Sequence, residues 1–171
     1  MLMYHPAQDI NHCVFRVLLI TEESEHDKIR IDVYRLIDFY TLFPYLLRLI
    51  VKLPSPLHRF KSKFNDIPEP FESLKNTKRI IYELEQLQST AIQNLVAKGL
   101  LDSESFNEGY LKRTDKELPE NFSDVIKDSR LLKEEWFEVL INEFPKAKLT
   151  GSNGLKARTG LMEYRYDLEK S

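Results

Sequence analysis

Three polar residues near the start of the chain have side chains that can bind a metal ion. His5, Asp9 and His12 are spaced by four and three residues, so a helix that reaches back to His5 places all three on one face. Imidazole and carboxylate groups are ligands for zinc and other transition metals. Pro6, however, is typical of a first helical position, which puts His5 at or before the helix start. We therefore expect the alternative, in which Asp9 pairs with His12 or with nearby backbone groups.

The single cysteine and one acid in an apolar stretch are further candidates for chemistry. Cys13 follows His12 directly, and adjacent residues of a helix point apart, so they cannot form a nucleophile and base pair. Asp38 lies among aromatic residues, where an unpaired carboxylate would be very costly. We expect this carboxylate to be bound by Arg16, Arg35 or His12. No second carboxylate or base that would make it a catalytic acid can be located, so we predict no catalytic residue and no enzyme.

The composition is that of an ordinary globular protein. Of 171 residues, 42% are hydrophobic and 30% are charged, and the net charge of -2 gives no global electrostatic case for a nucleic-acid binder. One cysteine suits a reducing compartment, so we expect a cytoplasmic protein. The five glycines form no phosphate-binding loop, and we predict no cofactor. Charged residues and Pro44 interrupt the longest apolar stretch, which argues against a membrane-spanning segment.

The elements that would position these residues fall into two halves. Residues 1–53 are predicted to be an apolar helical region that docks a partner, with helices over 6–20 and 32–43. The second of these helices is apolar on almost every side, so it must be buried by its own core or by a partner. Pro44 kinks it or begins another helix, because proline cannot continue the hydrogen-bond ladder. Residues 54–72 are rich in proline and predict a loop.

Residues 73–171 have the order of elements of a winged helix. Ser89 is a credible N-cap, and Gly99 is typical of a helix end. The predicted elements are helices over 73–87, 89–102 and 129–144, a hairpin of strands at 100–101 and 110–114, and one or two short strands containing Leu161, Tyr164 and Tyr166. We therefore expect a mainly α protein with a small β component, of the α+β class, whose C-terminal half is winged-helix-like.

Two clusters of basic residues are candidate contacts with phosphate. Between Tyr45 and Lys63 no acid opposes the cations, and between Lys146 and Tyr166 only Glu163 does. Each neutralised phosphate would release counterions, although a solvated face is the default explanation. The candidate DNA contacts, including two on the predicted wing, are Arg59, Lys61, Lys63, Lys112, Arg113, Lys156 and Arg158.

The first fifty residues resemble a known family. The stretch YHPAQDINHCVFRVLLIT, followed by IRIDVYRLIDFYTLFPYLL, is similar to the middle components of bacterial ABC-three-component systems. The resemblance covers mainly residues 4–50. The residues that carry it are Pro6, Asp9, His12, Phe15 and Arg16, then Asp38, Phe39, Tyr40, Phe43 and Pro44.

This resemblance implies a small accessory subunit that is not known as an enzyme. In the family's described setting, Lamassu-type defence against phages and plasmids, such a subunit bridges or stabilises an SMC-like or Rad50-like ATPase and an effector, often a nuclease. DNA within the complex is a further candidate partner. Aromatic side chains often anchor interfaces, and helix 32–43 has more apolar surface than a core of this size readily hides. We therefore expect partner contacts from Asp38, Phe39, Tyr40, Phe43, Pro44 and Tyr45.

Three functions follow from these patterns. The first is a non-catalytic assembly subunit, which we favour. The second is a winged-helix transcription regulator, which would bind specific DNA as a dimer and in a salt-sensitive manner. The third is a small metal-dependent hydrolase built on His5, Asp9 and His12.

Overall fold

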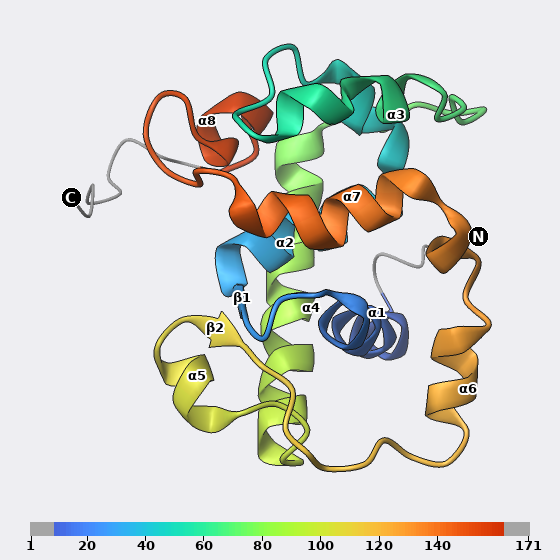
Figure 1. The fold of residues 1–171 in the computed structure, drawn as a ribbon, viewed down its shortest axis with the longest axis vertical. Helices are drawn as coiled ribbons and strands as arrows, with labels where there is room; N and C mark the ends of the chain where they lie inside the picture. The colour runs from blue at the N-terminus through green and yellow to red at the C-terminus, as the bar shows by residue number, and fades with distance from the viewer. Residues whose placement is uncertain (1–8, 163–171) are drawn as a thin grey trace.

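The computed structural model describes residues 9–162, which form a mainly helical protein with a small antiparallel sheet (Figure 1). The predicted mainly α class with a small β component is therefore confirmed. In chain order the elements are α1 (Ile10–Glu23), β1 (Ile29–Arg30), α2 (Ile31–Leu42), η2 (Pro44–Leu49), η3 (Leu57–Phe60), α3 (Lys61–Asn65) and α4 (Thr77–Ala97). There follow α5 (Ser103–Asn107), β2 (Tyr110–Leu111), α6 (Phe122–Lys127), η4 (Arg130–Lys133), α7 (Glu135–Glu143), η5 (Phe144–Lys146) and α8 (Leu155–Thr159).

Helix α4 is the long axis of the molecule, α1 and α2 pack against it, and α7 packs against α2 (Figure 1). Its inner stripe recurs at helical spacing, and the residues on that stripe are buried. The hydrophobic core draws on α1 and α2 from the first predicted region and on α4 and α7 from the last. The two halves of the sequence therefore share one core.

Helix α2 is buried on all sides within its own chain. The apolar pattern predicted a helix over 32–43, and the observed helix closely matches it. The helix ends where Phe43 leaves the helical region, and Pro44 then begins the 3-10 helix η2, because its fixed φ suits a first position and it lacks an N–H. Eight consecutive or near-consecutive residues of α2 are buried: Val33, Tyr34, Leu36, Ile37, Asp38, Phe39, Tyr40 and Thr41.

The predicted division of residues 73–102 into two helices is wrong. Helix α4 runs unbroken through Ser89, which does not cap a second helix but accepts a hydrogen bond from Arg35 at 3.1 Å. The physical reason is that no glycine or proline lies between residues 73 and 98, so nothing forces a turn near Ser89. The observed N-cap is Asn76, which has φ 58° and accepts a hydrogen bond from the Arg79 N–H. Lys98 and the left-handed Gly99 end the helix, as predicted for that glycine.

The sheet joins segments that are far apart in the sequence. β1 pairs antiparallel with β2, in the register Ile29 to Leu111 and Arg30 to Tyr110. An antiparallel bridge between Leu101 and Arg113 confirms the pairing of the predicted hairpin, although α5 fills its turn. The segment between the helices predicted over 6–20 and 32–43 thus contains half of the sheet.

The proline-rich segment and the C-terminal region also differ from expectation. Residues 54–72 contain η3 and α3, and Leu57, Phe64 and Ile67 are buried in the common core. Instead of a strand, α8 precedes Leu161, while Tyr164 and Tyr166 lie outside the described residues. Between residues 9 and 162 there is no helix that is both long and apolar enough to cross a membrane.

Candidate functional site

A buried ion pair connects the three central helices. The Arg16 Nε of α1 donates to an Asp38 oxygen of α2 at 2.5 Å, and Arg16 Nη2 donates to the other oxygen at 3.3 Å. Gln88 of α4 donates its amide N–H to the same carboxylate at 2.9 Å. The exposed fractions of the three residues are 5%, 0% and 0%. The expectation that Asp38 is paired in the interior is confirmed, with Arg16 as its partner.

Two weakly acidic groups lie in the same interior. Burial and the nearby negative charge of Asp38 raise the pKa of the Cys13 thiol to about 12. The same two causes raise the pKa of the Tyr34 hydroxyl well above its usual range. Both groups are therefore neutral at physiological pH, and a thiol in that state is a poor nucleophile. Arg35, the other arginine considered as a partner of Asp38, lies 3.6 Å from Glu85 of α4.

The residues weighed as metal ligands are arranged differently from a metal site. Asp9 is the N-cap of α1, and its Oδ1 accepts hydrogen bonds from the N–H groups of Asn11 and His12 at 2.8 and 3.3 Å. The predicted contact of Asp9 with nearby backbone groups is thus confirmed. The His12 side chain is exposed, and His5 lies outside the described residues. Within residues 9–162, no three His, Cys, Asp or Glu side chains are grouped as metal ligands.

The aromatic residues expected to meet a partner are largely internal. Asp38, Phe39, Tyr40 and Phe43 are 0%, 0%, 2% and 6% exposed, and the three rings contact one another or Phe144. The premise that α2 has more apolar surface than its own core can hide is therefore wrong, because α4, α7 and η5 cover it. Pro44 and Tyr45 are half-buried. Direct contact of these six residues with a partner stays a prediction.

The basic residues proposed as DNA contacts have partners within the chain. Acids pair with five of them: Arg59 with Glu143 (3.9 Å), Lys63 with Glu135 (3.4 Å), Lys112 with Asp27 (2.9 Å), Arg113 with Glu22 (2.5 Å) and Lys156 with Asp32 (3.0 Å). Lys61 donates to the carbonyl oxygens of Arg48 and Ile50 at 2.7 and 2.8 Å. Arg158 donates to the Asn153 side chain. The pairing of these cations with acids could not be predicted from the sequence, because most of the partners are distant in the chain.

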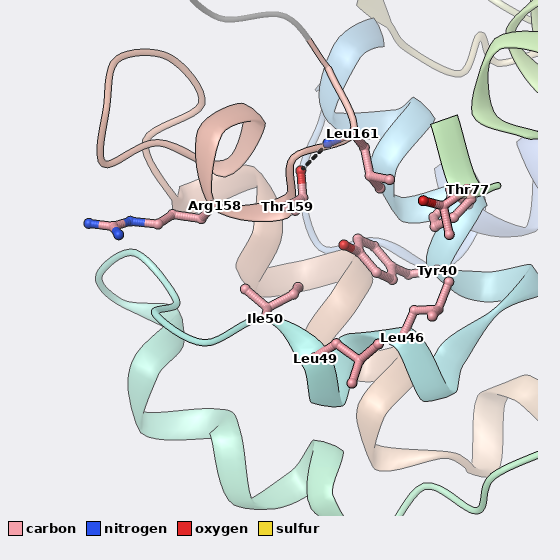
Figure 2. A pocket seen from close by; sticks show the side chains of 9 residues that line it. Tyr40, Leu46, Leu49, Ile50, Thr77, Arg158, Thr159 and Leu161 are labelled. Carbon is pink, nitrogen blue, oxygen red and sulfur yellow. Dashed lines mark hydrogen bonds between the residues drawn. The ribbon is translucent and has the colours of Figure 1, made fainter. Parts of the chain in front are cut away.

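Two hollows lined by both apolar and polar residues lie on the surface beside α2 and η2. One hollow, of about 120 Å³, has Phe39 and Tyr40 in its wall and Leu49 and Leu161 at its rim, while Arg158 points away from it (Figure 2). A second hollow, of about 360 Å³, also has Leu49 in its lining, together with Tyr45, Pro70 and the polar residues Arg48, Asn65, Glu69 and Ser73. Among residues 9–162, the large apolar side chains that remain exposed are Leu49 (70%), Val51 (87%), Phe71 (104%), Tyr82 (66%) and Val125 (53%).

Sequence reasoning missed Gln88 and these exposed side chains. Gln88 falls between the helices predicted over 73–87 and 89–102, so no sequence pattern indicates its central position in α4 or its contact with Asp38. Leu49 and Phe71 follow ordinary apolar patterns, and only the fold reveals that they are exposed.

The fold and the interior define a small helical protein in which buried polar groups connect the helices and the surface carries hollows and exposed apolar side chains. The family model for the ABC-three component (ABC-3C) system Middle Component 5 matches residues 2–167, so the chain belongs to that family. No curated protein and no solved structure matches it. The resemblance in residues 4–50 is thus confirmed at the level of the middle component and extends over nearly the whole chain. As a middle component, the protein associates with other components of its system.

Proposed function

We propose that this protein is the non-catalytic accessory subunit of a bacterial complex that defends against phages and plasmids. In this role it bridges or stabilises an SMC-like or Rad50-like ATPase and an effector nuclease. The family match over residues 2–167 carries the proposal. A third component between two larger ones needs surfaces for both, and it needs no reaction centre of its own.

The state of the buried groups supports a structural interior. Asp38 is held by Arg16 and Gln88, and the neighbouring Cys13 thiol has its pKa at about 12. A general acid or base works best when its pKa lies near the operating pH, and a nucleophilic thiol must lose its proton. These groups are thus better suited to fixing α1, α2 and α4 than to catalysis.

The exposed apolar residues support partner binding. Leu49 is part of η2 and lines the second hollow. Val51 follows η2, and Phe71 lies in the stretch before α4, next to Pro70 of the same lining. Exposed apolar patches next to concave surface are typical of protein interaction sites. These residues are stronger candidates for direct contact than the buried rings of Phe39 and Tyr40 in α2, which line the first hollow.

Co-expression with the two other components of the same system tests the proposal. We expect the three proteins to elute together in size-exclusion chromatography, and the solubility or activity of the ATPase or effector to depend on this chain. A protein that elutes alone, and whose omission changes neither of the other components, would overturn the proposed function.

A DNA-binding winged helix is a second candidate. The order α1, β1, α2, α4, Leu101, β2, with the β2 segment paired to both β1 and Leu101, favours a winged-helix chain path. Residues 43–76 would then be an insertion before the third helix. Against DNA binding, the cations Lys112 and Arg113 on this hairpin are paired with acids, and phosphate contacts dominate DNA affinity.

A gel-shift titration at several salt concentrations separates these candidates. If the accessory role is correct, the isolated chain forms no sequence-specific complex with duplex DNA. A salt-sensitive complex that competitor DNA does not displace would favour the regulator.

A further inference from the structure

A fully exposed phenylalanine lies between α3 and α4. Phe71 is 104% exposed, more than any other large apolar side chain of the described residues, and Pro68 to Ser73 are all exposed around it. We call residues 66–73 the Phe71 loop. In Figure 1 this loop projects beyond α3, away from the packed helices. Phenylalanine is an effective interface anchor, because its burial removes much apolar surface from water.

The Phe71 loop is anchored at both of its ends. Arg48 of η2 donates to the Ile67 carbonyl oxygen at 3.3 Å and lies 3.3 Å from Glu69. The Leu74 N–H donates to the Tyr45 hydroxyl oxygen at 2.7 Å. Pro68 and Pro70 restrict the backbone between these anchors. A side chain presented on such a restrained segment loses less conformational freedom on binding than one on a flexible tail.

The backbone of this loop is also free of secondary structure. Within residues 9–162, no backbone-to-backbone hydrogen bond involves residues 68–75. The segment is therefore an accessible stretch of chain rather than part of a helix or sheet, and it resembles the linear segments that bind in the grooves of other proteins.

The charge on the loop defines the chemistry of its partner. Asp66, Glu69 and Glu72 flank Phe71 in the sequence, Glu69 is paired with Arg48, and no Lys or Arg occurs between Asn65 and Leu74. All three acids are exposed. Complementary surfaces place opposite charges together, so the partner must present cations around the pocket that receives the ring. This charge also disfavours duplex DNA and anionic membranes as occupants.

We infer that the Phe71 loop is a docking element for another component of the same system, which receives Phe71 in an apolar pocket rimmed by Lys or Arg. The inference rests on the proposed function and names the segment and the partner's chemistry. The hollow beside the loop adds both apolar and polar contact surface, since it is lined by Tyr45, Leu49 and Pro70 and by Arg48, Asn65, Glu69 and Ser73. Arg48 connects this hollow to the loop through Glu69.

The test measures binding of the purified chain to each of the two other components. We expect Phe71→Ala to weaken binding to one of them by about 30-fold or more, as for an interface hot spot. The matched control is Val125→Ala, since Val125 is 53% exposed on α6, far from the loop in Figure 1. Both variants should keep the wild-type melting temperature, because neither side chain is buried.

Charge is tested separately with the double variant Asp66→Asn and Glu72→Gln. We expect it to weaken binding at low ionic strength by about tenfold and to reduce the salt dependence of the wild type. Glu69 is left intact in this variant because it pairs with Arg48.

The outcomes separate the two proposals. If the wild type binds a component and Phe71→Ala binds equally well, the docking inference is wrong and the proposed function stands. If the wild type binds neither component, the proposed function fails and the inference with it. Self-association or binding to anionic lipid vesicles that depends on Phe71, without loss of component binding in the variant, also overturns the inference.

Discussion

At the scale of single residues, the ion pair of Arg16 and Asp38 explains why an arginine and an acid occur in such apolar segments. The two side chains lie 22 positions apart and meet in the interior, where Gln88 completes the set. An isolated buried charge is far more costly than a paired one. Each residue therefore depends on the other.

Removing one partner of this pair should be strongly destabilising. We expect Asp38→Leu or Arg16→Met to lower the free energy of unfolding by about 3–5 kcal/mol, because each leaves its former partner buried and uncompensated. The double variant Arg16→Met with Asp38→Leu should cost clearly less than the sum. Urea denaturation of all four proteins measures this coupling.

The exposed pair of Arg79 and Glu83 is the control for that cycle. Its nitrogen and oxygen are 2.9 Å apart, comparable to the buried pair, but the side chains are 73% and 41% exposed. Replacement of Arg79 by Met should change stability by less than about 1 kcal/mol. Additive costs at Arg16 and Asp38 would contradict the structural role given to the buried pair.

Cys13 offers a test of the same interior through pH. Its pKa is raised from 9.0 to about 12 in the folded state, so folding favours the neutral thiol. This contribution is complete below pH 9 and is lost as the pH rises toward 12. Relative to Cys13→Ala, the wild type should therefore lose stability faster over that interval.

A thiol reagent checks the prediction directly. At pH 8 the native protein should react very slowly with a disulfide reagent, while the urea-unfolded chain reacts at the rate of a free cysteine. Rapid labelling of the native protein would show that the thiol is neither buried nor neutral.

At the scale of elements, the side chain of Lys61 caps the C-terminal end of the 3-10 helix η2. Its ammonium group donates to the carbonyl oxygens of Arg48 and Ile50, which the helix itself leaves unsatisfied. Burial and the nearby Arg48 lower the pKa of Lys61. A residue that looked like a phosphate contact thus stabilises the turn that presents Leu49.

Lys61→Met should lower the free energy of unfolding by about 1–3 kcal/mol, because the carbonyl groups lose a charged donor. Lys63→Met, on the same short helix α3, is the control, and it should change stability by less than about 1 kcal/mol since its pair with Glu135 is largely exposed. Thermal or urea unfolding distinguishes the two. Equal effects would mean that Lys61 does not cap η2.

The elements that sequence patterns predicted well are those with long apolar periodicity. The helix over 32–43 and the helix within 129–144 were found close to their predicted positions, since burial of an apolar stripe dominates their formation. α1 begins at Ile10 rather than near Pro6, because Asp9 provides the cap. The predicted helix break at Ser89 is wrong because a residue type that suits an N-cap can also lie inside a helix.

At the scale of the whole molecule, the sequence-based predictions that are wrong concern contacts between distant segments. The two-residue strands β1 and β2 are too short for any alternation, yet they join residues about eighty positions apart. The surface charge pattern was misread for a similar reason, because Lys112 and Asp27 are neighbours only in the fold. Asp38 could be predicted to have a partner, but the choice of Arg16 over Arg35 required the helix packing.

The enclosure of α2 has a consequence for how the chain is made. Its rings are covered in part by α7, which begins at Glu135, roughly a hundred residues after the start of α2. At a synthesis rate of about 5–20 residues per second, the apolar helix α2 leaves the ribosome about 5–20 s before α7 has been synthesised. During that interval it is a natural substrate for nascent-chain chaperones, and the half-made protein, rather than the finished one, is the form most prone to aggregation.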